Sequence, residues 1–106
     1  MGISQIGDDA VLYRDGFMTR SELLELVRAG AVGEVTGWAF DAEGRILDQG
    51  LNQRVTSVPP EPGSDRLRIC IAHGTAKVAP LRAALAGRIV NGLITDEDTA
   101  RALRAD

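Results

Sequence analysis

The residues best suited to chemistry lie in the segment RLRICIAHGTAKVAPLRAAL, which holds the chain's single histidine, His73, and its single lysine, Lys77. Gly74 stands between them, where a strand pattern changes into a helix pattern. A lysine at such a place suits phosphate or carbonyl chemistry, because the start of the next helix offers free N–H groups and a positive dipole end to an anion. The alternative is that Gly74 only makes the turn, His73 is a solvated loop residue and Lys77 is a surface lysine.

Glu34 is the acidic candidate. It follows an Ala-Val-Gly turn at the start of a strand pattern and is flanked by Val32 and Val35, so its carboxylate is expected to be partly buried. Its structural alternative is an acid that caps the neighbouring backbone or pairs with a nearby arginine.

Other kinds of site lack their residues. His73 and Cys70 are too few for a metal site and would point to opposite sides of a strand, so no metal and no cofactor is expected. The chain has no G-x-S-x-G elbow, no G-x-x-x-x-G-K-[ST] loop and no G-x-G-x-x-G turn. Cys70 is most simply a small core residue.

Length and charge narrow the class of protein. A chain of 106 residues corresponds to one domain. A net charge of -3 argues against a nucleic-acid-binding surface, since neutralising phosphates requires clustered Lys and Arg. No apolar run approaches the roughly 20 residues that span a bilayer, and no signal peptide is evident, so we expect a soluble, cytoplasmic protein without membrane contact.

Turn and capping signals divide the first part of the chain. Residues 3 to 6 indicate the end of a strand, and residues 8 to 14 are expected to form one or two helical turns. Thr19 and Glu22 make a T-x-x-E capping box, which predicts an amphipathic helix over residues 20 to 29, closed by the next glycine.

The pattern then changes to a period of two. Alternation over residues 35 to 40, a turn at residues 41 to 44 with its glycine at positive φ, and apolar residues 46 and 47 predict a β-hairpin. The PPEPG stretch at residues 59 to 63 is expected to be an exposed polyproline-like loop inside one domain.

The C-terminal part predicts a βαβα unit. A strand at residues 67 to 72, buried on both faces, suits a parallel sheet, and a second strand is expected at residues 89 to 94. Pro80 prevents the intervening helix from starting much before Ala76, which places Lys77 in its first turn. That helix is expected to end near Ala86, and a last helix to run from Asp96 to about Arg104 with a capping box from Thr95 and Asp98.

A family resemblance rests on four segments in series: GAVGEVTGWAFDAEGR, LNQRV, IAHGTAKVAPLRAAL and NGLITDEDTARAL. In order and spacing they resemble the C-terminal part of the effector-binding domain of SorC-family, DeoR-type bacterial transcriptional regulators. The resemblance implies a partial Rossmann-like α/β sheet related to ribose-phosphate isomerase and glucosamine-phosphate deaminase. It also implies a phosphorylated sugar or polyol as effector, whose binding alters the oligomeric state and the operator affinity of a repressor of carbohydrate metabolism.

The resemblance also implies site residues. Glu34 matches an acid that faces the effector, Lys77 matches the lysine after the family's Gly-Gly turn, and Gln5 lies at a pocket-facing strand end. His73 replaces the first glycine of that turn and Gly74 keeps the second, so both are expected at the effector.

The matched segments leave out the helix-turn-helix and the first half of the family's effector domain. We therefore expect residues 1 to 106 to be a C-terminal fragment with one wall of the pocket, without a DNA-binding domain and without catalysis. Exposed strand edges predict a homo-oligomer. Two alternatives remain open: a sugar-phosphate isomerase or deaminase fragment, with Glu34 as base and Lys77 as phosphate clamp, or a pure oligomerisation module.

Overall fold

The computed structural model describes residues 2–7, 16, 18–47 and 61–105. Its elements, in chain order, are β1 (Ile3–Gln5), α2 (Arg20–Arg28), β2 (Ala31–Val35), β3 (Trp38–Asp41), β4 (Ile69–Ile71), the 3-10 helix η2 (Thr75–Lys77), α3 (Val78–Ala86), β5 (Gly92–Ile94) and α4 (Glu97–Arg104). This mixture of small sheets and helices confirms the predicted α/β class. The predicted helical turns at residues 8 to 14 lie outside the described residues.

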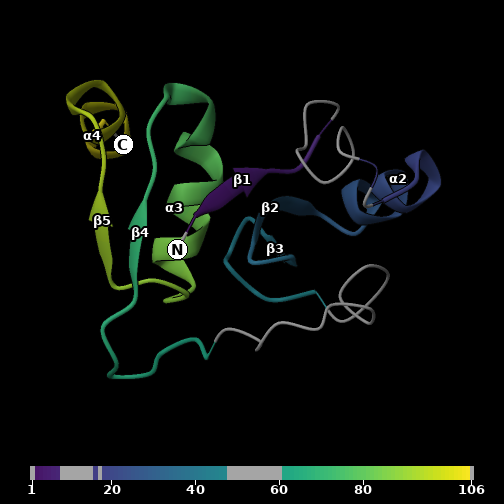
Figure 1. Cartoon of the computed structure of the whole chain (residues 1–106), viewed down its shortest axis with the longest axis horizontal. Helices are drawn as coiled ribbons and strands as arrows, with labels where there is room; N and C mark the ends of the chain where they lie inside the picture. Colours follow the sequence, from purple (N-terminus) through teal and green to yellow (C-terminus); the bar gives the residue numbers. More distant parts are fainter. Residues whose placement is uncertain (1, 8–15, 17, 48–60, 106) are drawn as a thin grey trace.

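Two small sheets stand on either side of α3 (Figure 1). β1, β2 and β3 form an antiparallel sheet, whereas β4 and β5 pair in parallel. The main core joins α3 to both sheets, and its fully buried members include Ile3, Phe40, Cys70, Leu81 and Ile89. A second cluster joins the antiparallel sheet to α2 and contains Met18, Leu23, Leu26, Ala31 and Ala39. The antiparallel sheet is therefore packed on both faces.

The predicted capping box at the start of α2 is confirmed. The Thr19 hydroxyl accepts a hydrogen bond from the Glu22 N–H at 3.1 Å, and the Glu22 carboxylate accepts one from the Thr19 N–H at 2.9 Å. Gly30 follows the helix with φ 96°, a conformation that a side chain would disfavour.

The hairpin prediction was only partly right. The expected alternation over residues 35 to 40 is broken by a tight turn, where Thr36 (φ 49°) and Gly37 (φ 94°) separate β2 from β3. Two consecutive positive φ values match the right-handed twist of the strands, so the chain turns here. The predicted second turn is present, with Gly44 at φ 78°, but the returning segment makes only a bridge between Phe40 and Ile46.

The parallel pairing of the predicted βαβ unit is confirmed, with strands shorter than expected. Ile69 to Ile71 pair with Gly92 to Ile94. The second strand begins three residues late because Arg88 takes φ 59° and the Ile89 N–H bonds to the carbonyl of Ala84 at 2.9 Å, which closes the end of α3. The apolar residues that suggested a strand at this position therefore pack at the C-terminal end of α3.

The prediction that the first strand of this unit, β4, is buried on both faces was wrong. Cys70 is fully buried toward α3, but the alternate residues Leu67 and Ile71 are 76% and 65% exposed, and Ile94 beside Ile71 is 57% exposed. Both α3 and the partly buried Leu103 of α4 pack against the core side of the strands. Within the described residues, the other side of the parallel pair is an open apolar face.

No helix in the described parts of the chain has the length and apolar character needed to cross a bilayer. Of the PPEPG loop, only residues 61 to 63 are described, and the Gly63 N–H bonds there to the carbonyl of Arg88 at 3.0 Å.

Candidate functional site

The candidate site is the turn that follows β4, which we call the His73–Lys77 turn. Beyond Ile71 the ladder continues for one bond, from the Ala72 N–H to the Ile94 carbonyl at 3.1 Å. The chain then bends at Gly74, whose φ of 99° is rarely adopted by residues with a side chain, and enters η2. Lys77 ends η2 and is the N-cap residue of α3, so it lies one residue before the first turn in which it was predicted.

The start of η2 has no side-chain cap. Free backbone N–H groups there, with half-buried Lys77 one turn on, give the turn the means to bind an anion. His73 is exposed beside them. The turn therefore keeps the chemistry that the sequence suggested.

Asp96, the residue that caps α4, holds this turn in place. Its Oδ1 accepts a hydrogen bond from the Thr99 N–H at 2.6 Å, and its Oδ2 accepts one from the Gly74 N–H at 2.8 Å. The predicted capping box of Thr95 and Asp98 was wrong, because Asp96 is the cap and Thr99 is the third helical residue. Asp is among the best N-cap residues, so the sequence carried that signal.

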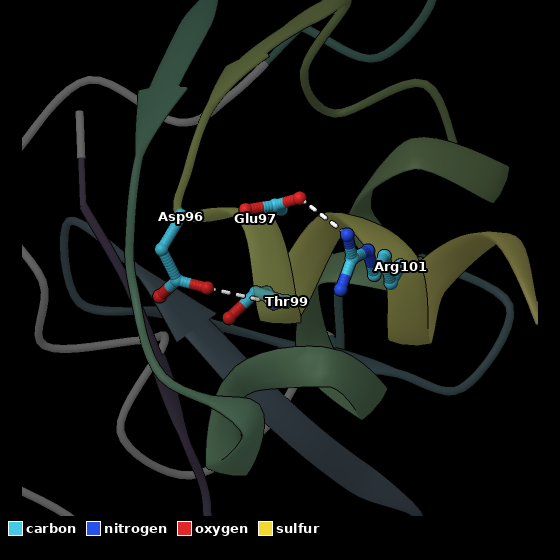
Figure 2. Close-up of polar contacts among 4 residues, drawn as sticks. All are labelled: Asp96, Glu97, Thr99 and Arg101. Atoms are coloured by element: carbon cyan, nitrogen blue, oxygen red, sulfur yellow. Dashed lines mark hydrogen bonds and ion pairs between the residues drawn. The ribbon is translucent and has the colours of Figure 1, made fainter.

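The contacts of Asp96 also set its charge state. Thr99, through its side chain and its N–H, and then the Gly74 N–H lower the pKa of the Asp96 carboxyl below its ordinary 3.8. Figure 2 shows the carboxylate directed at the start of α4. The Thr99 hydroxyl lies close enough to affect that pKa, yet it makes no hydrogen bond of ordinary geometry within the described residues, and neither does the buried Thr95 hydroxyl.

Glu97 and Arg101 form an exposed ion pair on the outer side of α4 (Figure 2). Such an exposed pair contributes little to stability in water.

Cys70 lies in β4, just before the turn, and is a buried, unreactive cysteine. Burial raises the pKa of its thiol, while the charge of Lys77 and a hydrogen bond to the backbone of Ile3 act in the opposite direction. The thiol stays protonated near neutral pH, as expected of a core cysteine.

Gln5 and Glu34 lie on different faces of the antiparallel sheet. Gln5 opposes Gly33, and a Cβ on Gly33 would lie 2.6 Å from the Pro80 Cβ, so this face looks toward α3. Glu34 opposes Ala39, which belongs to the cluster on the α2 side. One Glu34 oxygen accepts a hydrogen bond from the Gly37 N–H at 2.9 Å.

β1 contacts η2, so the structure brings the strand of Gln5 beside Lys77. It does not join Glu34 to Lys77: no ion pair or hydrogen bond links the two side chains in the described ranges. The backbone-capping alternative for Glu34 is the contact that the structure contains.

Arg68 is a structural residue that sequence reasoning missed. Its guanidinium donates to the carbonyls of Ile89 (2.8 Å), Arg88 (2.8 Å) and Arg66 (3.1 Å), and also to that of Ser64. The Asn91 side chain accepts from the Arg68 N–H at 2.7 Å and donates to the Arg66 carbonyl at 2.8 Å. Together they fix the segment that leads into β4 against the end of α3.

Residues 1–104 match the family described as "Putative sugar-binding domain". The transcriptional regulator LsrR of Enterobacter sp. (strain 638) is 35% identical over 99% of this chain and 34% of its own length. The erythritol catabolism regulatory protein EryD of Brucella abortus is 35% identical over 97% of this chain and 33% of its own length. The chain thus spans about a third of the length of these relatives.

A solved structure shares the fold. The full-length sorbitol operon regulator SorC of Klebsiella pneumoniae superposes with a TM-score of 0.78 at 25% identity, covering 96% of this chain and 33% of that one.

Proposed function

The chain belongs to the family of sugar-binding domains found in bacterial transcriptional regulators, and we propose that it senses an effector through the His73–Lys77 turn. This membership confirms the resemblance to SorC-family, DeoR-type regulators. The observation that carries the proposal is the coincidence of the family match, over residues 1–104, with an uncapped helix start next to the chain's only lysine.

The effector is a phosphorylated sugar or polyol. The N–H groups of η2 and the Lys77 ammonium suit a phosphate or another anionic group, and polar side chains near the turn suit hydroxyls. The name of the Brucella relative, which refers to erythritol catabolism, supports the polyol class. Effector binding alters oligomerisation and operator affinity of the regulator.

Residues 1 to 106 supply one wall of the pocket. Gln5, on the α3 side of the sheet and next to η2, belongs to that wall with His73, Gly74 and Lys77. Glu34 is the least favoured of the predicted contacts, because one of its oxygens already accepts the Gly37 N–H.

The regulator carries no catalysis in this part and contacts operator DNA through a helix-turn-helix domain outside residues 1 to 106. The relatives named above are regulators, which favours this over the isomerase or deaminase alternative. Isomerisation or deamination of a sugar phosphate by the protein would instead support the enzyme alternative.

The domain self-associates through the open face of β4 and β5. Ile71 and Ile94 lie side by side there and are more than half exposed, and exposed apolar surface of this kind drives association. We expect light scattering to show a dimer or larger species at micromolar concentration, and Ile71→Lys to reduce it. A stable wild-type monomer would remove this part of the proposal.

Titration of the Lys77→Ala variant of the intact regulator tests the site. The probes are erythritol 4-phosphate, erythritol and inorganic phosphate. Their binding is measured by calorimetric titration. Loss of a charge-assisted hydrogen bond should weaken binding of erythritol 4-phosphate by about one to two powers of ten. Glu34→Gln should weaken it less, since the amide keeps an acceptor oxygen.

Arg104→Ala is the matched control. It removes the same charge from an exposed position at the end of α4 and should leave the affinity within about twofold of wild type, as expected for a screened surface charge. Equal affinities for wild type and Lys77→Ala would show that Lys77 is a plain surface lysine.

A further inference from the structure

We propose that Asp96 is a positioning residue for the effector site: its carboxylate fixes the His73–Lys77 turn to the start of α4 and so sets the geometry that meets the ligand. The proposal rests on the proposed function. It adds a residue that touches no effector and acts through Gly74.

The link joins two segments that are distant in sequence. Gly74 and Asp96 are 22 residues apart, and each follows one of the two parallel strands, whose last residues, Ile71 and Ile94, are paired. The carboxyl ends of parallel strands lie at the same edge of a sheet, so the turn and α4 start side by side. A single carboxylate spans the junction with one oxygen on each side.

Little else holds the turn. Among the described residues, the Asp96–Gly74 bond is the one side-chain hydrogen bond that reaches residues 73 to 77. The η2 helix has no side-chain cap of its own, and Gly74, at φ 99°, is a glycine whose backbone is free to adopt many other conformations. Loss of the Asp96 acceptor would therefore let Gly74 rotate and move the N–H groups and Lys77 out of register with the ligand.

The surroundings of Asp96 distinguish this junction from an ordinary helix cap. Thr99 is fully buried, and its hydroxyl and that of Thr95 have no hydrogen-bond partner in the described part of the chain. Buried hydroxyls without partners are uncommon in packed interiors. Neither hydroxyl bonds to Gly74, so neither takes the place of the Asp96 carboxylate in holding the turn.

Charge alone predicts the opposite effect, which makes the proposal testable. Removing a carboxylate beside an anion-binding turn should strengthen binding of a phosphate, because a repulsion disappears. A positioning role predicts weaker binding. The sign of the change therefore separates the two.

Asp96→Ser is the decisive variant. Serine caps helices about as well as aspartate, so α4 keeps its cap at the Thr99 N–H, but the shorter side chain cannot also reach Gly74. We expect an unchanged thermal unfolding midpoint within about 3 °C. Affinity for erythritol 4-phosphate should fall about five- to tenfold, which corresponds to one lost hydrogen bond. In the ligand-free protein, the NMR signal of the Gly74 amide proton should move upfield relative to wild type, because its acceptor is gone.

Asp98→Asn is the matched control, since it removes an exposed carboxylate from the same helical turn. It should bind the probe as tightly as wild type or slightly more tightly. Unchanged or tighter binding by Asp96→Ser would overturn the positioning role while leaving the proposed function intact. If wild type binds none of the three probes, the proposed function fails, and the positioning role fails with it.

Discussion

Gly74→Ala should destabilise the protein through backbone strain alone. A Cβ at Gly74 would meet nothing within 4 Å, so no steric clash contributes, but φ 99° is a conformation that L side chains rarely adopt. Holding alanine there costs about 1–3 kcal/mol. If the residue rotates instead, it loses the hydrogen bond from its N–H to the Asp96 carboxylate.

Urea unfolding followed by the fluorescence of Trp38, the chain's only tryptophan, measures this loss. Trp38 packs against the main core, so its signal reports global unfolding. Gly7→Ala is the control, because a Cβ at Gly7 also meets nothing within 4 Å and its φ is not positive. It should stay within about 0.5 kcal/mol of wild type. If Gly74→Ala matched Gly7→Ala, the strained turn would not exist as described.

Two further predictions concern stability. Arg68→Ala should lower the free energy of unfolding by about 2–3 kcal/mol, since several carbonyls lose a charged donor, and Arg66→Ala, an exposed neighbour, should change it by less than about 0.5 kcal/mol in the same urea assay. The stabilisation by Asp96 should depend on pH: because its folded pKa lies below 3.8, the difference in stability between wild type and Asp96→Asn should be constant above about pH 5 and shrink as the pH falls through the folded pKa. A difference that grew in acid would contradict the direction of that pKa.

Local signals in the sequence were sufficient where the structure depends on neighbouring residues. The capping box of Thr19 and Glu22, Gly44 at positive φ, and the parallel strands on either side of α3 all follow from short patterns. The turn at Thr36 was missed because a β-branched residue at positive φ is uncommon, so nothing in the local pattern marked it.

The misses at the site have another cause. The bond between Asp96 and Gly74 joins residues 22 apart, and neither residue's local pattern specifies its distant partner. The exposure of Ile71 could not be predicted either, because an apolar run reads alike whether one or both faces of a strand are covered. Sequence reasoning therefore located the turn but not the residue that holds it.

The parallel pair combines two features that must be separated experimentally. Its carboxyl end carries the His73–Lys77 turn, and its outer face exposes Ile71, two residues before His73. A partner that covers that face therefore contacts β4, the strand that leads into the turn. Ile71→Lys alters the face without removing the Asp96 bond, whereas Asp96→Ser releases the turn without altering the face. If Ile71→Lys reduced association but kept the affinity for erythritol 4-phosphate, assembly and ligand geometry would be independent; a parallel loss of both would show that the covered face holds the strand on which the turn depends.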